Sequence, residues 1–162
     1  MSSIPRVALL VVAVALPAAG GYAVAAARQA SGQPVRTALA QAVDPTGAKG
    51  RTLALSRVTI PPHTALALHR HPGTQVAYIE HGTLTYTVKR GGVPVYRGRA
   101  DQHPRLVRRV TGGHSGTVHS GEWVIERPSA IHFGANKGDR TLVILLATLF
   151  TNGSPPSIPV AG

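Results

Sequence analysis

From Arg51 to Phe150 the sequence is a succession of short apolar runs that stop at glycine or proline. Within these runs, which include TLALSRVTI, QVAYIEH and TLTYTVKR, apolar residues recur at every second position. This spacing predicts strands with one buried face, because side chains two positions apart on a strand point to the same side of the sheet. About eight or nine such runs, with no convincing helical pattern, predict an all-β sandwich or barrel.

A chain of 162 residues with 43% apolar residues is long enough to bury a stable core without disulfides or a structural metal. The sequence contains no cysteine, which excludes disulfides, zinc–thiolate sites and thiol nucleophiles. We therefore expect one barrel domain over residues 36–150. The proline-rich ending, residues 151–162, is expected to be a loosely held tail.

The first 27 residues differ in composition from the rest of the chain. Arg6 precedes the unbroken apolar run VALLVVAVAL, and small residues lead up to Arg28. This layout is typical of a secretory signal peptide. It predicts a secreted or extracytoplasmic protein, in the periplasm or the cell envelope, with a short linker at residues 28–35. The alternative is a retained N-terminal membrane anchor, because residues 7–27 are long enough to cross a bilayer as a helix.

Basic residues outnumber acidic ones by 17 to 6, which gives a formal net charge of +11. Five arginines fall between Arg97 and Arg109, but no aromatic residue accompanies them. Because single-stranded nucleic acids are bound by stacking bases on aromatic side chains, and because an exported protein seldom meets DNA or RNA, nucleic acid is not an expected partner. The charge indicates either a solvated arginine-rich loop or attraction to envelope polymers, a membrane surface or small anionic molecules.

Two histidines stand two positions apart in the segment HRHPGTQ, which runs from His69 to Gln75. On a strand, His69 and His71 would project from the same face. Gln75 enters the next run after a Pro-Gly turn, and its side chain can swing back to the same point. Neutral imidazoles are the commonest metal ligands. Two histidines at this spacing are nevertheless more often an ordinary polar strand end, so the segment alone does not establish a site.

The wider pattern resembles the two sequence motifs of the cupin superfamily. The residues at the spacing of the first motif are His69, His71, Gln75 and Gly82. Those that match the second motif are Gly121, Pro128, His132 and Asn136. The resemblance covers roughly residues 63–136, and it implies a single-domain jelly roll, which is a double-stranded β-helix barrel.

The resemblance also implies a metal site with a defined ligand set. Its members, which would converge inside the barrel on one divalent transition metal, are His69, His71, Gln75 and His132. Manganese, iron, zinc, nickel and copper all suit such nitrogen and oxygen donors, so the identity of the metal stays open. The surrounding strands would form a mostly apolar pocket for a small molecule.

Three features depart from the motifs. His63 stands where glycine is usual, which puts a side chain into the turn before the first motif. The spacing from Pro128 to His132 is one residue shorter than usual, and Ala130 replaces a glycine there. Gln75 replaces the acidic ligand.

The replacement of a glutamate by Gln75 has an electrostatic consequence. A glutamate would lower the charge of a divalent site by one, whereas a neutral glutamine leaves both positive charges. The open coordination position would then favour an anionic ligand, which the arginine excess of the chain would attract. The alternative is that the glutamine marks a site that has lost its metal and keeps only the fold.

Two function classes stay open. The first is a metal-dependent enzyme, an oxygenase, decarboxylase or isomerase of the cupin type, that acts on a small anionic molecule. The second is a non-catalytic binding module that holds a ligand in the barrel without a metal. Cupins commonly pair through sheet edges or swapped strands, so a homodimer is a further expectation, with residues 35–50 as a candidate arm.

Other polar and aromatic residues receive no functional role. Glu122 and Glu126 share one face of a predicted strand, but the sequence identifies no cleft in which paired carboxylates would act. Tyr78 and Trp123 are expected to pack in the barrel core, and Tyr86 is given no function.

Overall fold

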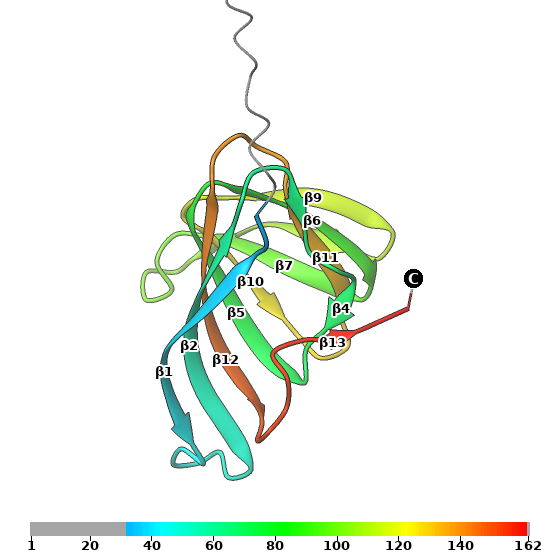
Figure 1. The fold of residues 1–162 in the computed structure, drawn as a ribbon. Coiled ribbons are helices and arrows are strands. Elements are labelled where there is room, and N and C mark those ends of the chain that lie inside the picture. Colours follow the sequence, from blue (N-terminus) through cyan, green and yellow to red (C-terminus); the bar gives the residue numbers. More distant parts are fainter. Residues whose placement is uncertain (1–31, 162) are drawn as a thin grey trace, which may run out of the picture.

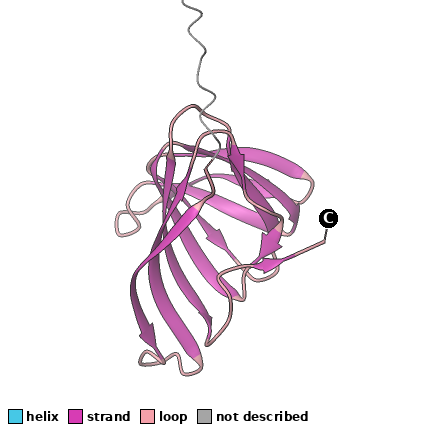
Figure 2. Ribbon diagram, in the orientation of Figure 1, coloured by secondary structure: helices cyan, strands magenta, loops and turns pink. Residues whose placement is uncertain are grey.

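The computed structural model describes residues 32–161 of the chain (Figure 1). Over this range every regular element is a β-strand, and helices are absent (Figure 2). The predicted signal segment, 1–27, and the first residues of the predicted linker lie outside the described residues. Residues 32–161 provide no helix with the length and apolar character that a membrane crossing requires.

The strands form two antiparallel sheets. In chain order they are β1 (Val35–Val43), β2 (Arg51–Ile60), β3 (Thr64–Ala65), β4 (His69–Arg70), β5 (Gly73–His81), β6 (Thr83–Arg90), β7 (Gly92–Arg97), β8 (Arg105–Thr111), β9 (His114–His119), β10 (Glu122–Glu126), β11 (Ile131–Asn136), β12 (Leu142–Thr151) and β13 (Ile158–Pro159). A 7-stranded sheet has the order β1-β2-β12-β5-β10-β7-β8, and a 6-stranded sheet has the order β13-β4-β11-β6-β9, with β3 paired to β11. The predicted all-β fold is therefore confirmed.

Strand β5 shows how the period-two pattern builds the barrel. Gln75, Ala77 and Ile79 are buried, whereas the residues between them face outward and Tyr78 is 42% exposed. The expectation that Tyr78 packs in the core is wrong, because its position on the strand gives it the outward face. β12, the last apolar run, lies between β2 and β5 and pairs with both.

The space between the two sheets is filled by aliphatic side chains from both. Its fully buried members include Ile60, Ile79, Val88, Val93, Val95, Val118, Val124 and Leu142. Burial of such side chains stabilises the fold by roughly 25 cal/mol per Å² of apolar surface removed from water. A second set of buried side chains is polar, and it includes His71, Gln75, Glu126 and His132.

The proline-rich ending of the chain packs back on the barrel. β13 pairs with β4, with Ile158 opposite Arg70 and Pro159 opposite His69. Figure 1 shows this segment crossing beside β4. Past the strand, the backbone N–H of Val160 donates to the carbonyl of Leu68 at 3.1 Å. The expectation of a loosely held tail is therefore corrected, because these backbone hydrogen bonds join the tail to the smaller sheet.

Candidate metal centre

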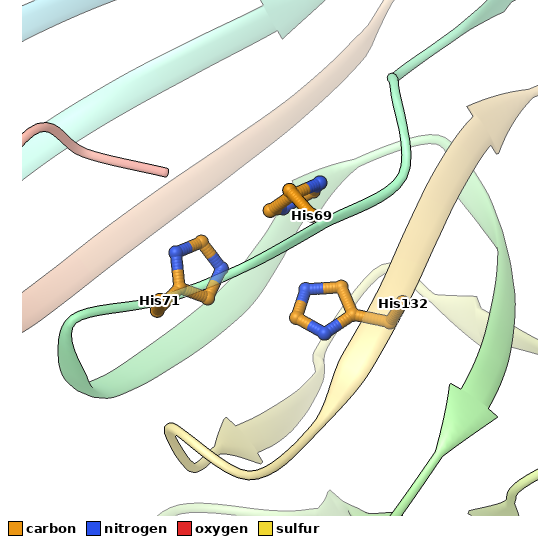
Figure 3. A group of neighbouring side chains, drawn as sticks. All are labelled: His69, His71 and His132. Carbon is orange, nitrogen blue, oxygen red and sulfur yellow. The ribbon is translucent and has the colours of Figure 1, made fainter. Parts of the chain in front are cut away.

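Three imidazoles meet inside the barrel. His69 and His132 are register partners on the adjacent strands β4 and β11, and His71 follows β4 directly. Their rings are turned toward one another (Figure 3), with centroid separations of 4.9, 4.6 and 5.1 Å. One ring nitrogen from each residue lies within 4.8 Å of the others. The structure thus brings together histidines from both predicted motifs.

The inward direction of His132 depends on an irregularity in strand pairing. Ile131 pairs with Arg90 on β6, but His132 pairs with Val88, so the register shifts between them. A shift of one residue exchanges the two faces of a strand. His132 therefore shares a face with the buried Val88 rather than with the exposed Lys89. The shortened spacing that precedes His132 in the sequence is compatible with an inward imidazole.

The turn that enters the first motif keeps the backbone conformation of a glycine although it carries His63. The φ angle of His63 is 54°, in the left-handed region that is unfavourable for residues with a Cβ atom. At the other end of the motif, Gly82 closes β5 with a φ angle of 88°. His63 therefore has a backbone conformation that glycine adopts more easily.

Two of the imidazoles are oriented by backbone carbonyls. Nδ1 of His69 donates to the carbonyl of Ala67 at 2.7 Å, and Nδ1 of His71 donates to the carbonyl of Pro156 at 2.9 Å. A carbonyl oxygen only accepts, so each Nδ1 carries the proton and each neutral ring keeps its lone pair on Nε2. Metal-binding histidines are commonly held in this way through the second ring nitrogen.

A carboxylate from a third strand adjoins the imidazoles. Glu126 on β10 is 3% exposed, and its Oε2 lies 3.2 Å from Nε2 of His71 while its Oε1 lies 3.4 Å from Nε2 of His132. Gln75 is the register partner of Glu126 on β5, and its amide donates to the carboxylate. The hydroxyl of Tyr86 donates to Oε1 at 2.7 Å.

These contacts leave one nitrogen with conflicting demands. Nε2 of His71 lies 3.2 Å from the amide nitrogen of Gln75, which can only donate, and 3.2 Å from an oxygen of Glu126, which accepts. In the neutral ring, with its proton on Nδ1, no N–H is left to donate to the carboxylate. A cation between the imidazoles and the carboxylate would remove the repulsion between the Nε2 lone pair of His71 and the oxygen of Glu126. Two donor atoms bound to one ion at about 2.1 Å lie roughly 3.0 to 3.4 Å apart, a range that includes the separations of the Glu126 oxygens from Nε2 of His71 and of His132.

The protonation states favour a cation at the same point. Burial lowers the pKa of His132 to about 4, although Glu126 opposes the shift, and burial also lowers the pKa of His69. For Glu126, burial would raise the pKa, but contact with His71 and the charges of His132 and His71 lower it to about 2. At neutral pH the rings of His69 and His132 are therefore neutral, and the carboxylate of Glu126 is ionised.

Glu126 and Tyr86 were not predicted as parts of the site. One sequence signal was available for Glu126, because it has the strand parity of Val124, an apolar residue at an inward position. The sequence pattern did not show that β10 pairs with β5 and sets Glu126 opposite Gln75. Tyr86 lies two positions after Leu84 on β6 and shares its inward face. Its place in the sequence pattern is therefore that of an ordinary core residue.

A cavity of about 310 Å³ opens beside the cluster, which contributes His69, His71 and His132 to its wall. The remaining lining is mostly aliphatic and includes Val58, Leu66, Leu68, Leu84, Ile144 and Leu146. Among the described lining residues, Arg36 is the only arginine or lysine and Glu126 the only aspartate or glutamate. A mostly apolar pocket is what the resemblance to cupins implied.

No protein-family model and no curated protein matches the sequence. Solved structures are similar in fold. A cupin superfamily protein from Desulfitobacterium hafniense matches with a TM-score of 0.50 and 16% identity, over 75% of this chain and 81% of that one. A cupin 2 domain-containing protein from Halorhodospira halophila matches with a TM-score of 0.51 and 15% identity, over 79% and 71%. At these identities the likeness shows the fold alone, which is the predicted cupin-type jelly roll.

Proposed function

We propose that this cupin-type barrel binds one divalent transition-metal ion through His69, His71 and His132, and that the cavity beside the ion takes a small anionic molecule. The observation that carries the proposal is the convergence of three imidazoles on the wall of a cavity of about 310 Å³. A cavity of this volume lies at the small end of the range for ligand pockets.

The residues around the cluster have separate tasks in this proposal. The carbonyls of Ala67 and Pro156 fix the rings of His69 and His71, and the aliphatic wall limits access of water. Burial raises the pKa of Tyr86, as does Glu126, so the hydroxyl stays protonated and holds the carboxylate in place. A bound divalent ion would act as a Lewis acid toward an oxygen atom of the ligand.

The charges that line the cavity support an anionic ligand. Arg36 is the register partner of Val58, which packs against the core, so its side chain leaves β1 on the cavity side. Arg36 and Glu126 offset each other, and a divalent ion would therefore leave the cavity with two positive charges. Guanidinium groups bind carboxylates and phosphates through paired hydrogen bonds. The neutral Gln75 alone would leave the charge of the ion uncompensated, but the site contains a second candidate for that task, the buried carboxylate of Glu126.

The reaction class stays open among oxygenation, decarboxylation and isomerisation. One observation favours a non-catalytic binding module as the second candidate. Tyr86 and Glu126 are the cavity's groups, apart from the imidazoles, that could exchange a proton, and they are hydrogen-bonded to each other. A proton donor or acceptor free to serve a substrate is not seen among the described lining residues.

Two expectations about the setting of the site stay predictions. The signal-like pattern in residues 1–27 supports export, and the retained anchor is its alternative. A homodimer is expected from the resemblance to cupins. Leu53, Leu55 and Leu149 are between 37% and 47% exposed on the larger sheet, which is compatible with a second copy on that sheet.

Metal analysis of the purified protein tests the proposal. The wild type should contain close to one transition-metal ion per chain after reconstitution, and His132→Ala should lose it, because the substitution removes a buried ligand. His114→Ala is the matched control, since His114 is exposed and lies outside the cavity. A wild type that stays free of metal after exposure to manganese, iron, zinc, nickel and copper would leave the non-catalytic module as the function.

A further inference from the structure

We infer that Glu126 supplies the negative charge of this metal centre, in place of the glutamate that the first motif would have at position 75. The inference rests on the proposed metal centre. It adds a carboxylate donor from β10, a strand that the predicted ligand set did not include. Gln75, in turn, becomes the residue that positions this carboxylate.

Strand pairing puts the two positions directly opposite each other. Gln75 on β5 and Glu126 on β10 are register partners with inward side chains, exposed by 4% and 3%. Neighbouring strands lie about 4.8 Å apart, so a side chain from either strand reaches the same region of the barrel. Moving the carboxylate from one partner to the other keeps the charge beside the imidazoles.

The contacts of Glu126 are those of a ligand rather than of a remote charge. Its two oxygens lie 3.2 Å and 3.4 Å from Nε2 of His71 and His132. Both nitrogens belong to the cluster that could hold the metal. A carboxylate at these separations from two ligands is within reach of an ion that the ligands share.

Comparison with Glu122 shows that Glu126 has no arginine or lysine partner among the described residues. Its ion-pair neighbours are instead the proposed ligands His71 and His132. Both carboxylates lie on the inward face of β10, but Glu122 forms ion pairs with Arg97 at 2.7 Å and with Arg108 at 2.6 Å. The hydrogen-bond donors of Glu126 are Gln75 and Tyr86, which are both neutral. Arg36 acts on Glu126 only through its electrostatic field, without an ion pair among the described contacts. A buried carboxylate needs a compensating charge, and a metal ion would provide it.

The same geometry explains why position 75 carries an amide. A glutamate there would face Glu126 across the strand pair, and two buried carboxylates in contact cannot both stay ionised. Glutamine keeps the shape of glutamate and donates a hydrogen bond to Glu126. The departure from the first motif is therefore matched by a carboxylate on the neighbouring strand.

An exchange of the two side chains tests the inference, with Co²⁺ as the probe and titration calorimetry and Co²⁺ absorption spectra as readouts. Glu126→Gln should weaken Co²⁺ binding by about 10- to 100-fold and change the spectrum. Gln75→Glu combined with Glu126→Gln should bring affinity back to within about threefold of the wild type. Glu80→Gln, an exposed carboxylate on the outer face of β5, is the matched control and should bind as the wild type does.

The outcomes separate this inference from the proposed function. If Glu126→Gln binds Co²⁺ as tightly as the wild type while His132→Ala does not bind it, the metal centre stands and the inference is overturned. If Gln75→Glu combined with Glu126→Gln binds Co²⁺ no better than Glu126→Gln alone, the inference is also overturned. A carboxylate at position 75 would then not replace the one at position 126. If the wild type itself binds no metal, both fail. Thermal unfolding of each metal-free variant checks that a lost affinity is not a lost fold.

Discussion

Glu122 is fully buried, with 0% exposure, and is held by three donors. Arg97 and Arg108 form ion pairs with it, and the backbone N–H of His119 donates at 2.9 Å. Burial alone would raise the pKa of Glu122, but these donors outweigh it and the pKa is lowered. The carboxylate therefore joins β7, β8 and β10 within the larger sheet.

The lowered pKa predicts how stability depends on pH. Because the pKa of Glu122 is lower in the folded state, its contribution is present above the unfolded value of 4.5 and is lost as pH falls through the folded value. Glu122→Gln should lower the free energy of unfolding by about 2 to 3 kcal/mol at neutral pH. Urea unfolding at a series of pH values should show this difference shrinking below about pH 4.5.

Glu80→Gln provides the control for this pH series. Glu80 is exposed and pairs with Arg57 at 3.3 Å, and an exposed ion pair contributes little to stability. Its substitution should change stability only slightly at any pH. A difference between wild type and Glu122→Gln that stays constant down to about pH 3 would contradict the role given to Glu122.

The individual site residues were predictable from sequence to different degrees. His69, His71 and His132 stand at motif spacing, and the structure places their rings together. Glu126 was overlooked because a carboxylate on an apolar strand face has meaning only when its neighbour on the adjacent strand is known. That neighbour is Gln75, 51 residues away in the sequence.

At the level of elements, the proline-rich ending contributes to the site. Its Pro156 carbonyl accepts the hydrogen bond from Nδ1 of His71, and Pro156, Ser157 and Pro159 line the cavity. β13 holds this segment in place by pairing with β4, the strand that carries His69. The tail therefore orients one proposed ligand and forms part of the wall.

Truncation after Ser154 should weaken Co²⁺ binding by about 10-fold, because His71 would lose the acceptor that orients its ring. Truncation after Val160 is the matched control, since it keeps Pro156 and β13 and should leave affinity unchanged. Titration calorimetry with both forms measures the effect. Equal affinity in the two truncated proteins would show that the tail has no part in holding the ligand.

The existence of the strands was more predictable than their pairing. Period-two runs located most strands between β2 and β12, because each strand has one face in the core. The exception is β9, which lies in the glycine-rich stretch TGGHSGTVHSG, whose composition predicts a turn. The tail was misjudged because prolines usually disfavour a strand, yet Pro159 lies at the end of β13, on the edge of its sheet. Proline is tolerated at such edges, where its missing N–H is not needed.

At the scale of the whole molecule, both sheets contribute side chains to the proposed metal centre. The smaller sheet provides His69 from β4 and His132 from β11, and the larger sheet provides Gln75 and Glu126 from β5 and β10. The aliphatic core between the sheets keeps these four side chains in fixed relative positions. The proposed ion would therefore lie between sheets that are joined by the whole core rather than on a mobile loop.

The central claim is that three histidines from two distant segments bind one metal ion. The most direct measurement is anomalous diffraction at the cobalt edge from crystals of the Co²⁺-loaded protein. We expect one strong peak per chain within bonding distance, about 2.1 Å, of a ring nitrogen from each of His69, His71 and His132. A peak elsewhere on the protein, or none at this cluster in fully loaded crystals, would contradict the claim.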